Sequence, residues 1–304
     1  MQKIEYADDG QFCSGHVACA GCVEALAMRV ILNAVGPDAV GVVSPSCTAV
    51  ILGGHPLSSA RIPFLHGTLE SAAASATGVK RALRARGKDD TTVLCLAGDG
   101  GTYDIGLQSL SSAAERNEDI LYVCFDNEGY MNTGVQRSSA TPPAARTATT
   151  PAVGDEPGNV FGTGKFVPKI AVAHDIPYVA TASVADLHDL EAKVTKAMSF
   201  HGARYIQIHV PCPLGWGAAS HDTIRLARLA IETGLFPIFE AEAGRVTHVR
   251  KIRKRVPVTD YLKPQRRFAH LFKGGAVDPR VARIQAIADR HIEDYDLLEA
   301  GAAA

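Results

Sequence analysis

The fold is indicated by residues 92–101, TVLCLAGDGG, in which a short apolar run ends in a glycine-rich turn. The run over residues 92–96, rich in Val and Leu, favours a buried strand of a parallel sheet. Glycines after such a strand let the backbone approach an anion, and a following helix directs its free N–H groups at the same point. Asp99 would repel a phosphate directly, but its carboxylate suits a Mg²⁺ ion that bridges to one. We therefore expect a site for a magnesium-bound phosphate at the end of this strand.

A second polar loop, DNEGYMNTG over residues 126–134, follows the next predicted strand, residues 120–125. Asn127 lies 127 − 99 = 28 positions after Asp99, which leaves room for one strand and one helix, predicted over residues 104–116. Both loops should emerge at the carboxyl edge of adjacent parallel strands, where ligands bind in such sheets. A Gly-Asp-Gly sequence alone occurs in many turns, so the pairing of the two loops is what indicates a site.

Strands and helices alternate through the rest of the chain. We predict strands over residues 39–43, 178–181 and 205–209, and helices over residues 68–86 and 184–200. This order favours a doubly wound, mostly parallel α/β sheet with helices on both faces. Residues 138–164 lack periodicity and predict a long functional or interfacial loop. We expect a cofactor-binding domain over residues 1–245 and a C-terminal helical extension, residues 246–304, that packs on a partner subunit.

Composition and charge exclude several classes of protein. The chain has 304 residues and a formal net charge of −1, whereas a nucleic-acid-binding protein needs a basic surface. The basic run at residues 250–255 is better explained by a solvated face or a contact between subunits than by RNA or membrane binding. The polar N-terminus lacks the apolar core of a signal peptide, and no apolar run is long enough to cross a bilayer. We expect a cytoplasmic protein with neither nucleic-acid nor membrane partners.

Seven cysteines in a reducing compartment are not expected to form disulfides, which draws attention to those that cluster. Cys19 and Cys22 form a C-x-x-C pair, which alone is compatible with zinc, redox or iron–sulfur chemistry. Cys47 and Cys212 each follow a predicted strand and so should reach the sheet edge that carries the two polar loops. Four thiolates beside a cofactor suit a [4Fe–4S] cluster. Structural zinc stays open as an alternative, although zinc usually draws its ligands from two local pairs.

The other three cysteines have no expected place at this edge. Cys95 and Cys124 lie inside predicted strands, where a free thiol behaves as a small hydrophobe. The role of Cys13 is left open.

The two polar loops resemble the thiamine-diphosphate motif, in which Asp and Asn side chains and a backbone carbonyl bind Mg²⁺. Together with the cysteines they resemble the β subunit of pyruvate:ferredoxin oxidoreductase and related 2-oxoacid oxidoreductases. The resemblance is carried by residues 15–26, 98–106, 122–137, 209–216 and 261–272. It implies the thiamine-diphosphate-binding (PP-type) version of the predicted fold. It also implies that Asp99, Asn127 and the carbonyl of Gly129 bind Mg²⁺.

The same resemblance implies roles for other residues. The implied ligands of the [4Fe–4S] cluster are Cys19, Cys22, Cys47 and Cys212. The implied contacts to thiamine diphosphate are Glu24, Cys47, Gly98, Asp99, Gly100, Gly101, Asn127, Gly129, Tyr130, Met131 and Asn132. Asn132 should face the reacting centre as a catalytic residue, whereas Glu24 also fits a simple position in the first turn of a helix. Val23 stands where many relatives have glycine, and its branched side chain should alter the packing beside the cluster while leaving the cluster ligands unchanged.

The implied activity is oxidative decarboxylation of a 2-oxoacid, with pyruvate as the family default, to CO₂ and an acyl-CoA, with coenzyme A as co-substrate. The buried glutamate that contacts the thiamine ring normally comes from a second domain, which these residues do not contain. We therefore expect activity only with an α-type subunit, together with ferredoxin-like or flavin-containing electron-transfer subunits that deliver electrons to ferredoxin or NAD.

Three alternatives remain open. The first is the same chemistry on phenylglyoxylate, 2-oxoisovalerate or oxalate. The second is a non-redox thiamine-dependent decarboxylase or ligase, and the third is a zinc-stabilised, non-catalytic assembly subunit.

Overall fold

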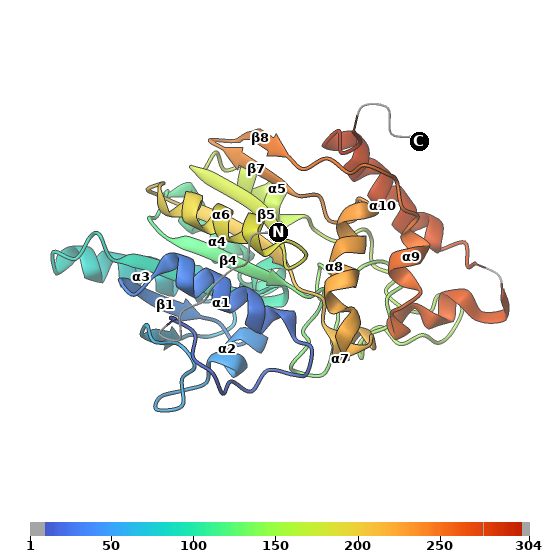
Figure 1. Ribbon diagram of the computed structural model, residues 1–304, viewed down its shortest axis with the longest axis horizontal. Coiled ribbons are helices and arrows are strands. Elements are labelled where there is room, and N and C mark those ends of the chain that lie inside the picture. Colours follow the sequence, from blue (N-terminus) through green and yellow to red (C-terminus); the bar gives the residue numbers. More distant parts are fainter. Residues whose placement is uncertain (1–9, 276, 300–304) are drawn as a thin grey trace.

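An eight-stranded sheet forms the centre of the computed structural model, which describes residues 10–275 and 277–299 (Figure 1). The strands lie in the order β2-β1-β3-β4-β6-β5-β7-β8. Their bounds are β1 (Ala39–Val43), β2 (Phe64–His66), β3 (Thr92–Gly98), β4 (Leu121–Asp126), β5 (Tyr178–Ser183), β6 (Arg204–His209), β7 (Phe239–Glu242) and β8 (Arg245–Val249). The first six pair in parallel, whereas β7 and β8 form an antiparallel hairpin at one edge. The predicted mostly parallel α/β fold is confirmed, and the edge hairpin was not predicted.

Helices connect these strands. The longer ones are α1 (Val23–Val35), α3 (Ala72–Ala85), α4 (Leu107–Glu115), α6 (Leu187–Met198), α8 (Thr223–Glu232) and α10 (Val281–Asp294). The shorter ones are α2 (Cys47–Leu52), α5 (Val167–Val172), α7 (Pro213–Trp216), α9 (Val258–Leu262), the π-helical η1 (Gly100–Ile105) and the 3-10 segments η2 (Ser220–Asp222) and η3 (Arg266–Gly275). The helix predicted to begin at residue 104 instead begins in η1, because the glycines expected to form a turn make the first π-helical turn.

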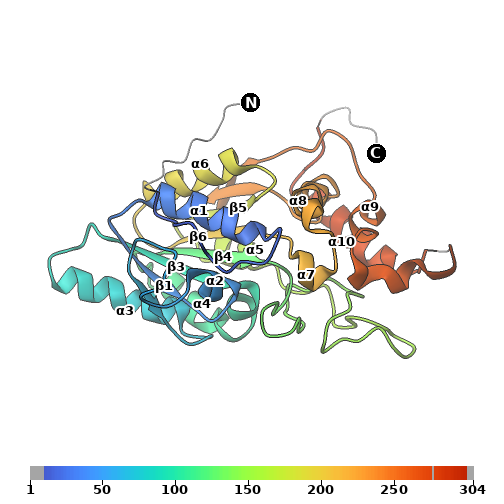
Figure 2. The same cartoon turned by 60° about the horizontal axis from the view of Figure 1, so that its bottom comes forward.

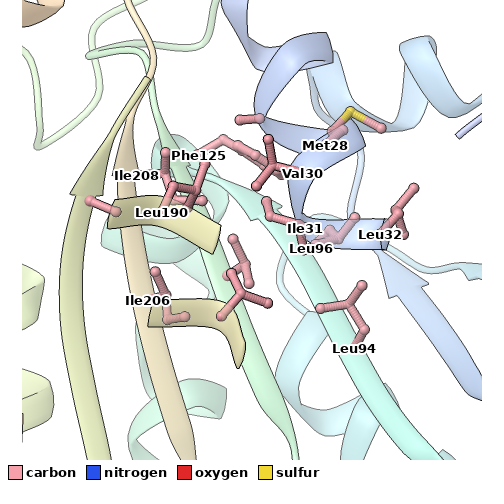
Figure 3. Close-up of a cluster of buried hydrophobic side chains, with 14 of the residues drawn as sticks. Met28, Val30, Ile31, Leu32, Leu94, Leu96, Phe125, Leu190, Ile206 and Ile208 are labelled. Atoms are coloured by element: carbon pink, nitrogen blue, oxygen red, sulfur yellow. The ribbon is translucent and has the colours of Figure 1, made fainter. Parts of the chain in front are cut away.

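Each face of the sheet buries its own hydrophobic core, because successive side chains of a strand point to opposite faces. Leu94 and Leu96 of β3 meet α1 and α6 on one face (Figure 3). Cys95 of β3 and Cys124 of β4 are fully buried on the other face, beside α3, α4 and α5, as expected of apolar thiols. Figure 2 shows α1 and α6 side by side on their face of the sheet.

A third core lies beyond the sheet, among α8, α9, η3 and α10. Its fully buried members include Trp216 of α7, Tyr261 of α9, Phe268 of η3 and Ile284 of α10. The expected boundary at residue 245 falls in the β7–β8 hairpin, and the helices that follow pack on α8 of the same chain. Packing of this extension on a partner subunit stays a prediction.

Buried charges lie at the amino edge of the strands, away from the predicted site. Asp119 accepts from the Arg204 guanidinium at 2.7 Å and forms an ion pair with Lys80 at 2.9 Å. Both cationic side chains are almost fully buried. This cluster ties α3 to β4 and β6.

Much of the basic run at residues 250–255 is neutralised within the chain. Ion pairs join Arg250 to Asp186, Lys251 to Asp296, Arg253 to Glu299 and Arg255 to Asp289. In the part of the chain that the structure describes, no helix has the length and apolar character needed to span a membrane.

Candidate active site

The two polar loops meet at the carboxyl edge of the sheet, because β3 and β4 are adjacent and parallel. Asp99 follows β3 and is fully buried. Its Oδ1 accepts from the backbone N–H of Asn127 at 3.4 Å, and its Oδ2 accepts from the Ser138 hydroxyl at 2.5 Å. Burial raises the pKa of Asp99 well above its ordinary value, and the neighbouring Asp126 raises it further. The carboxylate therefore favours a nearby positive charge.

The side-chain oxygen of Asn127 lies close to two other acceptor oxygens. The side-chain oxygen of Asn127 lies 2.8 Å from the Gly129 carbonyl oxygen and 3.0 Å from Asp99 Oδ1, while its nitrogen faces Glu24 Oε2 at 3.4 Å. These oxygens have no proton between them and repel one another, so without a ligand the Asn127 amide would favour the rotated orientation, in which its nitrogen donates to both other oxygens. A bound cation would instead favour the orientation in which the Asn127 oxygen faces them. Adjacent ligands of an octahedral Mg²⁺ with bonds of about 2.1 Å lie ~3.0 Å apart, which matches the two distances from the Asn127 oxygen.

The glycine-rich turn brings backbone close to the same point. Gly100 begins η1, and π-helical turns occur often at functional sites. A Cβ on Gly100 would lie 2.3 Å from the ring of Tyr130, so only glycine fits there. The Tyr130 hydroxyl donates to the Gly100 carbonyl at 3.0 Å and to Asp104 Oδ2 at 2.9 Å. These contacts fix the second loop against the first.

Glu24 reaches the site from α1, where it is the second residue of the helix. Its Oε1 accepts from the Thr48 hydroxyl at 2.6 Å, and its Oε2 lies near the Asn127 amide. Burial raises the pKa of Glu24 to about 7, against the lowering effect of these two hydrogen bonds. Glu24 thus sits in the first turn of a helix and also faces the site.

Three of the four expected cluster cysteines sit at helix N-termini, where backbone N–H groups favour a thiolate. Cys22 precedes α1, Cys47 begins α2 and Cys212 precedes α7. Burial, then Glu24 and then Cys212 raise the pKa of Cys22 to about 11. Burial raises the pKa of Cys212, and Cys19 adds to that rise. Beyond burial, Cys212 and Cys22 also raise the pKa of Cys47, so the four thiols lie close enough to influence one another.

The backbone also donates to two of these sulfur atoms. The N–H of Gly215 donates to Cys212 Sγ at 3.2 Å. Burial raises the pKa of Cys47, whereas a hydrogen bond from the backbone N–H of Asn132 lowers it. Among residues 10–275 and 277–299, no three side chains of His, Cys, Asp or Glu lie close enough to share one metal ion. Convergence of the four thiolates on a [4Fe–4S] cluster stays a prediction.

Asn132, the predicted catalytic residue, is exposed at the tip of the second loop, whereas the preceding Met131 is buried. Its backbone joins this loop to Cys47, so the loop borders both the oxygen cluster and the cysteines. The side chain faces outward from this chain.

Comparisons with known proteins identify the family to which the chain belongs. The family model described as "Thiamine pyrophosphate enzyme, C-terminal TPP binding domain" matches residues 48–208, which is more than half of the chain. Pyruvate synthase subunit PorB of Methanosarcina barkeri is 46% identical over 285 residues, covering 93% of this chain and 96% of PorB. The chain belongs to the thiamine-diphosphate-binding β-subunit family of 2-oxoacid:ferredoxin oxidoreductases.

Other relatives of this β subunit differ in their substrate. Ketoisovalerate oxidoreductase subunit VorB of Pyrococcus abyssi is 42% identical over 279 residues, covering 90% of this chain and 89% of VorB. A solved structure of 2-oxoglutarate:ferredoxin oxidoreductase from Magnetococcus marinus has a TM-score of 0.58 and 21% identity, covering 73% of this chain and 79% of that chain. This last likeness shows the shared fold.

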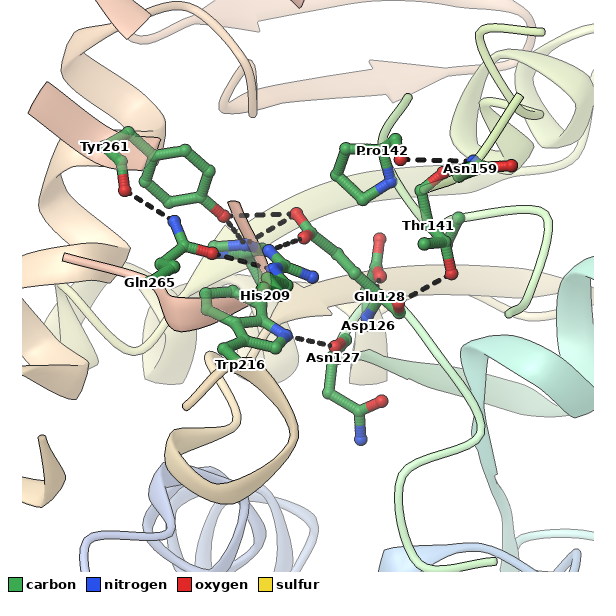
Figure 4. A network of polar contacts seen from close by, with 12 residues as sticks. Asp126, Asn127, Glu128, Thr141, Pro142, Asn159, His209, Trp216, Tyr261 and Gln265 are labelled. Carbon is green, nitrogen blue, oxygen red and sulfur yellow. Dashed lines mark hydrogen bonds and ion pairs between the residues drawn. The ribbon is translucent and has the colours of Figure 1, made fainter. Parts of the chain in front are cut away.

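Sequence reasoning missed the network of side chains behind the second loop of the β subunit (Figure 4). The indole N–H of Trp216 donates to the Asn127 carbonyl at 2.8 Å. Arg267 forms an ion pair with Glu128, which also accepts from the Tyr261 hydroxyl at 3.2 Å. Residues 209–216 and 261–272 contain Trp216, Tyr261 and Arg267 and contributed to the family resemblance, but the sequence did not indicate what these side chains contact. Ser138 was also missed, because it lies in the long loop that has no periodicity.

Proposed function

We propose that this β subunit binds thiamine diphosphate through Mg²⁺ held by Asp99, Asn127 and the Gly129 carbonyl, and that it serves the oxidative decarboxylation of pyruvate. The Asn127 side-chain oxygen carries the proposal, because it lies 2.8 Å from the Gly129 carbonyl oxygen and 3.0 Å from Asp99 Oδ1. Pyruvate is the first candidate, because a pyruvate synthase subunit is 46% identical and a ketoisovalerate oxidoreductase subunit is 42% identical. 2-Oxoisovalerate is therefore the second candidate.

Thiamine diphosphate, when bound, supplies the group that attacks the keto carbon and accepts the electron pair released as CO₂ leaves. The residues of this chain provide the place for that chemistry. The glycines from Gly98 to Gly101 lead into η1, whose N-terminal N–H groups favour the charge of a diphosphate. Glu24 is buried at the same edge and is positioned to hold a proton or a polar edge of the cofactor.

The four cysteines are the proposed ligands of a [4Fe–4S] cluster that accepts the electrons. N–H groups directed at Cys47 and Cys212 stabilise negative charge on sulfur, and hydrogen bonds of this kind raise the reduction potential of such clusters. Coenzyme A is the proposed acyl acceptor, since the related 2-oxoglutarate enzyme was solved with coenzyme A and succinyl-CoA bound.

Partner subunits complete the proposed enzyme in the cytoplasm. Val17 and Leu214 are 70% and 71% exposed, and each lies two residues from a cluster cysteine, Cys19 and Cys212 respectively. Exposed apolar side chains beside a functional site suit a protein interface. An α-type subunit there would cover Asn132 and supply the rest of the thiamine site, and ferredoxin-like or flavin-containing subunits would carry electrons onward.

The test is turnover of the purified multi-subunit complex with pyruvate, 2-oxoisovalerate, phenylglyoxylate and 2-oxoglutarate. We expect coenzyme-A-dependent reduction of an electron acceptor, fastest with pyruvate and absent from the isolated chain. Release of CO₂ without electron transfer would instead support a non-redox thiamine enzyme. Zinc without thiamine binding would support the assembly subunit.

A further inference from the structure

Arg267 is a buried cation behind the loop that carries the proposed magnesium ligands. It is the second residue of η3 and forms an ion pair with Glu128, which lies 139 residues earlier in the chain. Its Nε donates to Gln265 Oε1 at 2.8 Å, and its Cζ lies 4.0 Å from the centre of the Trp216 ring. Only 3% of the side chain is exposed. The guanidinium therefore contacts one carboxylate, one amide oxygen and the rings of Trp216 and Phe268.

Both partners of Arg267 act on the loop. Trp216 donates its indole N–H to the carbonyl of Asn127 at 2.8 Å. Glu128 lies between Asn127 and Gly129 in the sequence and has a φ of +63°, a conformation that disfavours residues with a Cβ. The ion pair at its side chain holds this unfavourable conformation. The two contacts thus restrain the loop at Asn127, whose side chain faces Asp99, and at the residue directly after it.

We propose that Arg267 is a positioning residue for the divalent cation. It sets the oxygens of Asn127 and Gly129 through Trp216 and Glu128, and it does not itself touch the cation. A planar guanidinium can stack on an indole and pair with a carboxylate at once, which a lysine ammonium does less well. This inference rests on the proposed function, because the cation is the one that accompanies thiamine diphosphate.

The same contacts reach the expected cluster ligand. Trp216 lies in α7, and its backbone N–H donates to the carbonyl of Cys212 at 3.0 Å.

Trp216 is also the single tryptophan of the chain. Its emission in the assembled complex, isolated as the difference between the wild-type and Trp216→Phe complexes, should therefore change when the cation binds beside Asn127.

The test measures binding of Mn²⁺, as a spectroscopic substitute for Mg²⁺, to the assembled complex at saturating thiamine diphosphate. The free ion is counted by electron paramagnetic resonance. We expect Arg267→Met to raise the half-saturating Mn²⁺ concentration about tenfold or more, because Glu128 then lacks its buried partner. Glu128→Gln should change the Mn²⁺ concentration in the same direction, and Arg267→Lys should give an intermediate value. Arg204→Met is the matched control, since it removes an equally buried arginine–carboxylate pair at the opposite edge of the sheet.

The outcomes separate this inference from the proposed function. If the wild-type complex binds no Mn²⁺ with thiamine diphosphate, the proposed function itself fails. If the wild type binds Mn²⁺ and Arg267→Met leaves the half-saturating concentration unchanged, the positioning role is wrong. An equal change in Arg204→Met would also overturn it, because the effect would then reflect general stability. Should Arg267→Met not assemble, Arg267→Lys and Glu128→Gln decide by the same comparison.

Discussion

Asp99→Asn should separate the stability of this β subunit from its binding of the cofactor. The substitution keeps the size of the side chain and one acceptor oxygen, but it removes the charge that a cation requires. Asp99 is fully buried, and burial followed by the charge of Asp126 raises its pKa. An ionised carboxylate there lowers the stability of the folded chain above the pKa of the unfolded state. The neutral variant should therefore be more stable without ligand, by about 1–3 kcal/mol.

The stability gained on binding magnesium and thiamine diphosphate should be smaller in Asp99→Asn than in the wild type. A ligand present at about one hundred times its dissociation constant stabilises the folded state by about 2.7 kcal/mol. The wild-type complex should show this gain when magnesium and thiamine diphosphate are added together. Asp99→Asn should show almost none of it, because the variant lacks the single charged group among the three proposed ligands.

Denaturant unfolding of the assembled complex, with and without the two ligands, measures both parts. Asp119→Asn is the control, since it alters a buried acid at the opposite edge of the sheet. That variant should lose basal stability and keep the ligand-dependent gain. If Asp99→Asn kept the full gain, the assignment of Asp99 to the cation would be refuted.

Three further predictions concern single side chains. Ser138→Ala removes the hydroxyl that donates to Asp99 and should weaken magnesium binding about tenfold in titrations of the complex. Gly100→Ala should displace the Tyr130 ring and sharply reduce thiamine-dependent turnover, with partial recovery when Tyr130→Ala is added; an active single variant would contradict this. Burial alone would raise the pKa of Asp119, but its buried cationic partners hold it below the ordinary value. The ionised side chain should therefore stabilise the fold above about pH 4, and this stabilisation should be lost as the pH falls through the lowered pKa of the folded state. In Asp119→Asn, the free energy of unfolding should depend less on pH in this acidic range.

The sequence pattern predicted the placement of the two polar loops, because that placement follows from the order of strands and helices. Apolar runs separated by helices placed the loops of Asp99 and Asn127 on neighbouring parallel strands, and the structure confirms that placement. The run at residues 39–43 matches β1, whereas the glycines expected to form a turn after β3 begin the π-helical η1. These features depend on contacts close in sequence or on the regular geometry of a parallel sheet.

The supporting contacts depend on packing that no local pattern encodes. Trp216 and Arg267 reach the second loop from segments 89 and 139 positions away from their partners. Ser138 lies in a loop without periodicity, so its bond to Asp99 left no sequence signal. The edge hairpin of β7 and β8 was missed because its strands are short and β8 is mostly exposed.

We propose that cysteines of this chain hold a cluster that takes electrons from the 2-oxoacid. The most direct test compares the wild-type complex with a complex that carries Cys212→Ser, by metal analysis and by electron paramagnetic resonance after addition of pyruvate and coenzyme A. The proposed function predicts that the variant loses about four irons per β chain, together with the pyruvate-induced cluster signal. Unchanged iron content, or zinc in place of iron in the wild type, would contradict it.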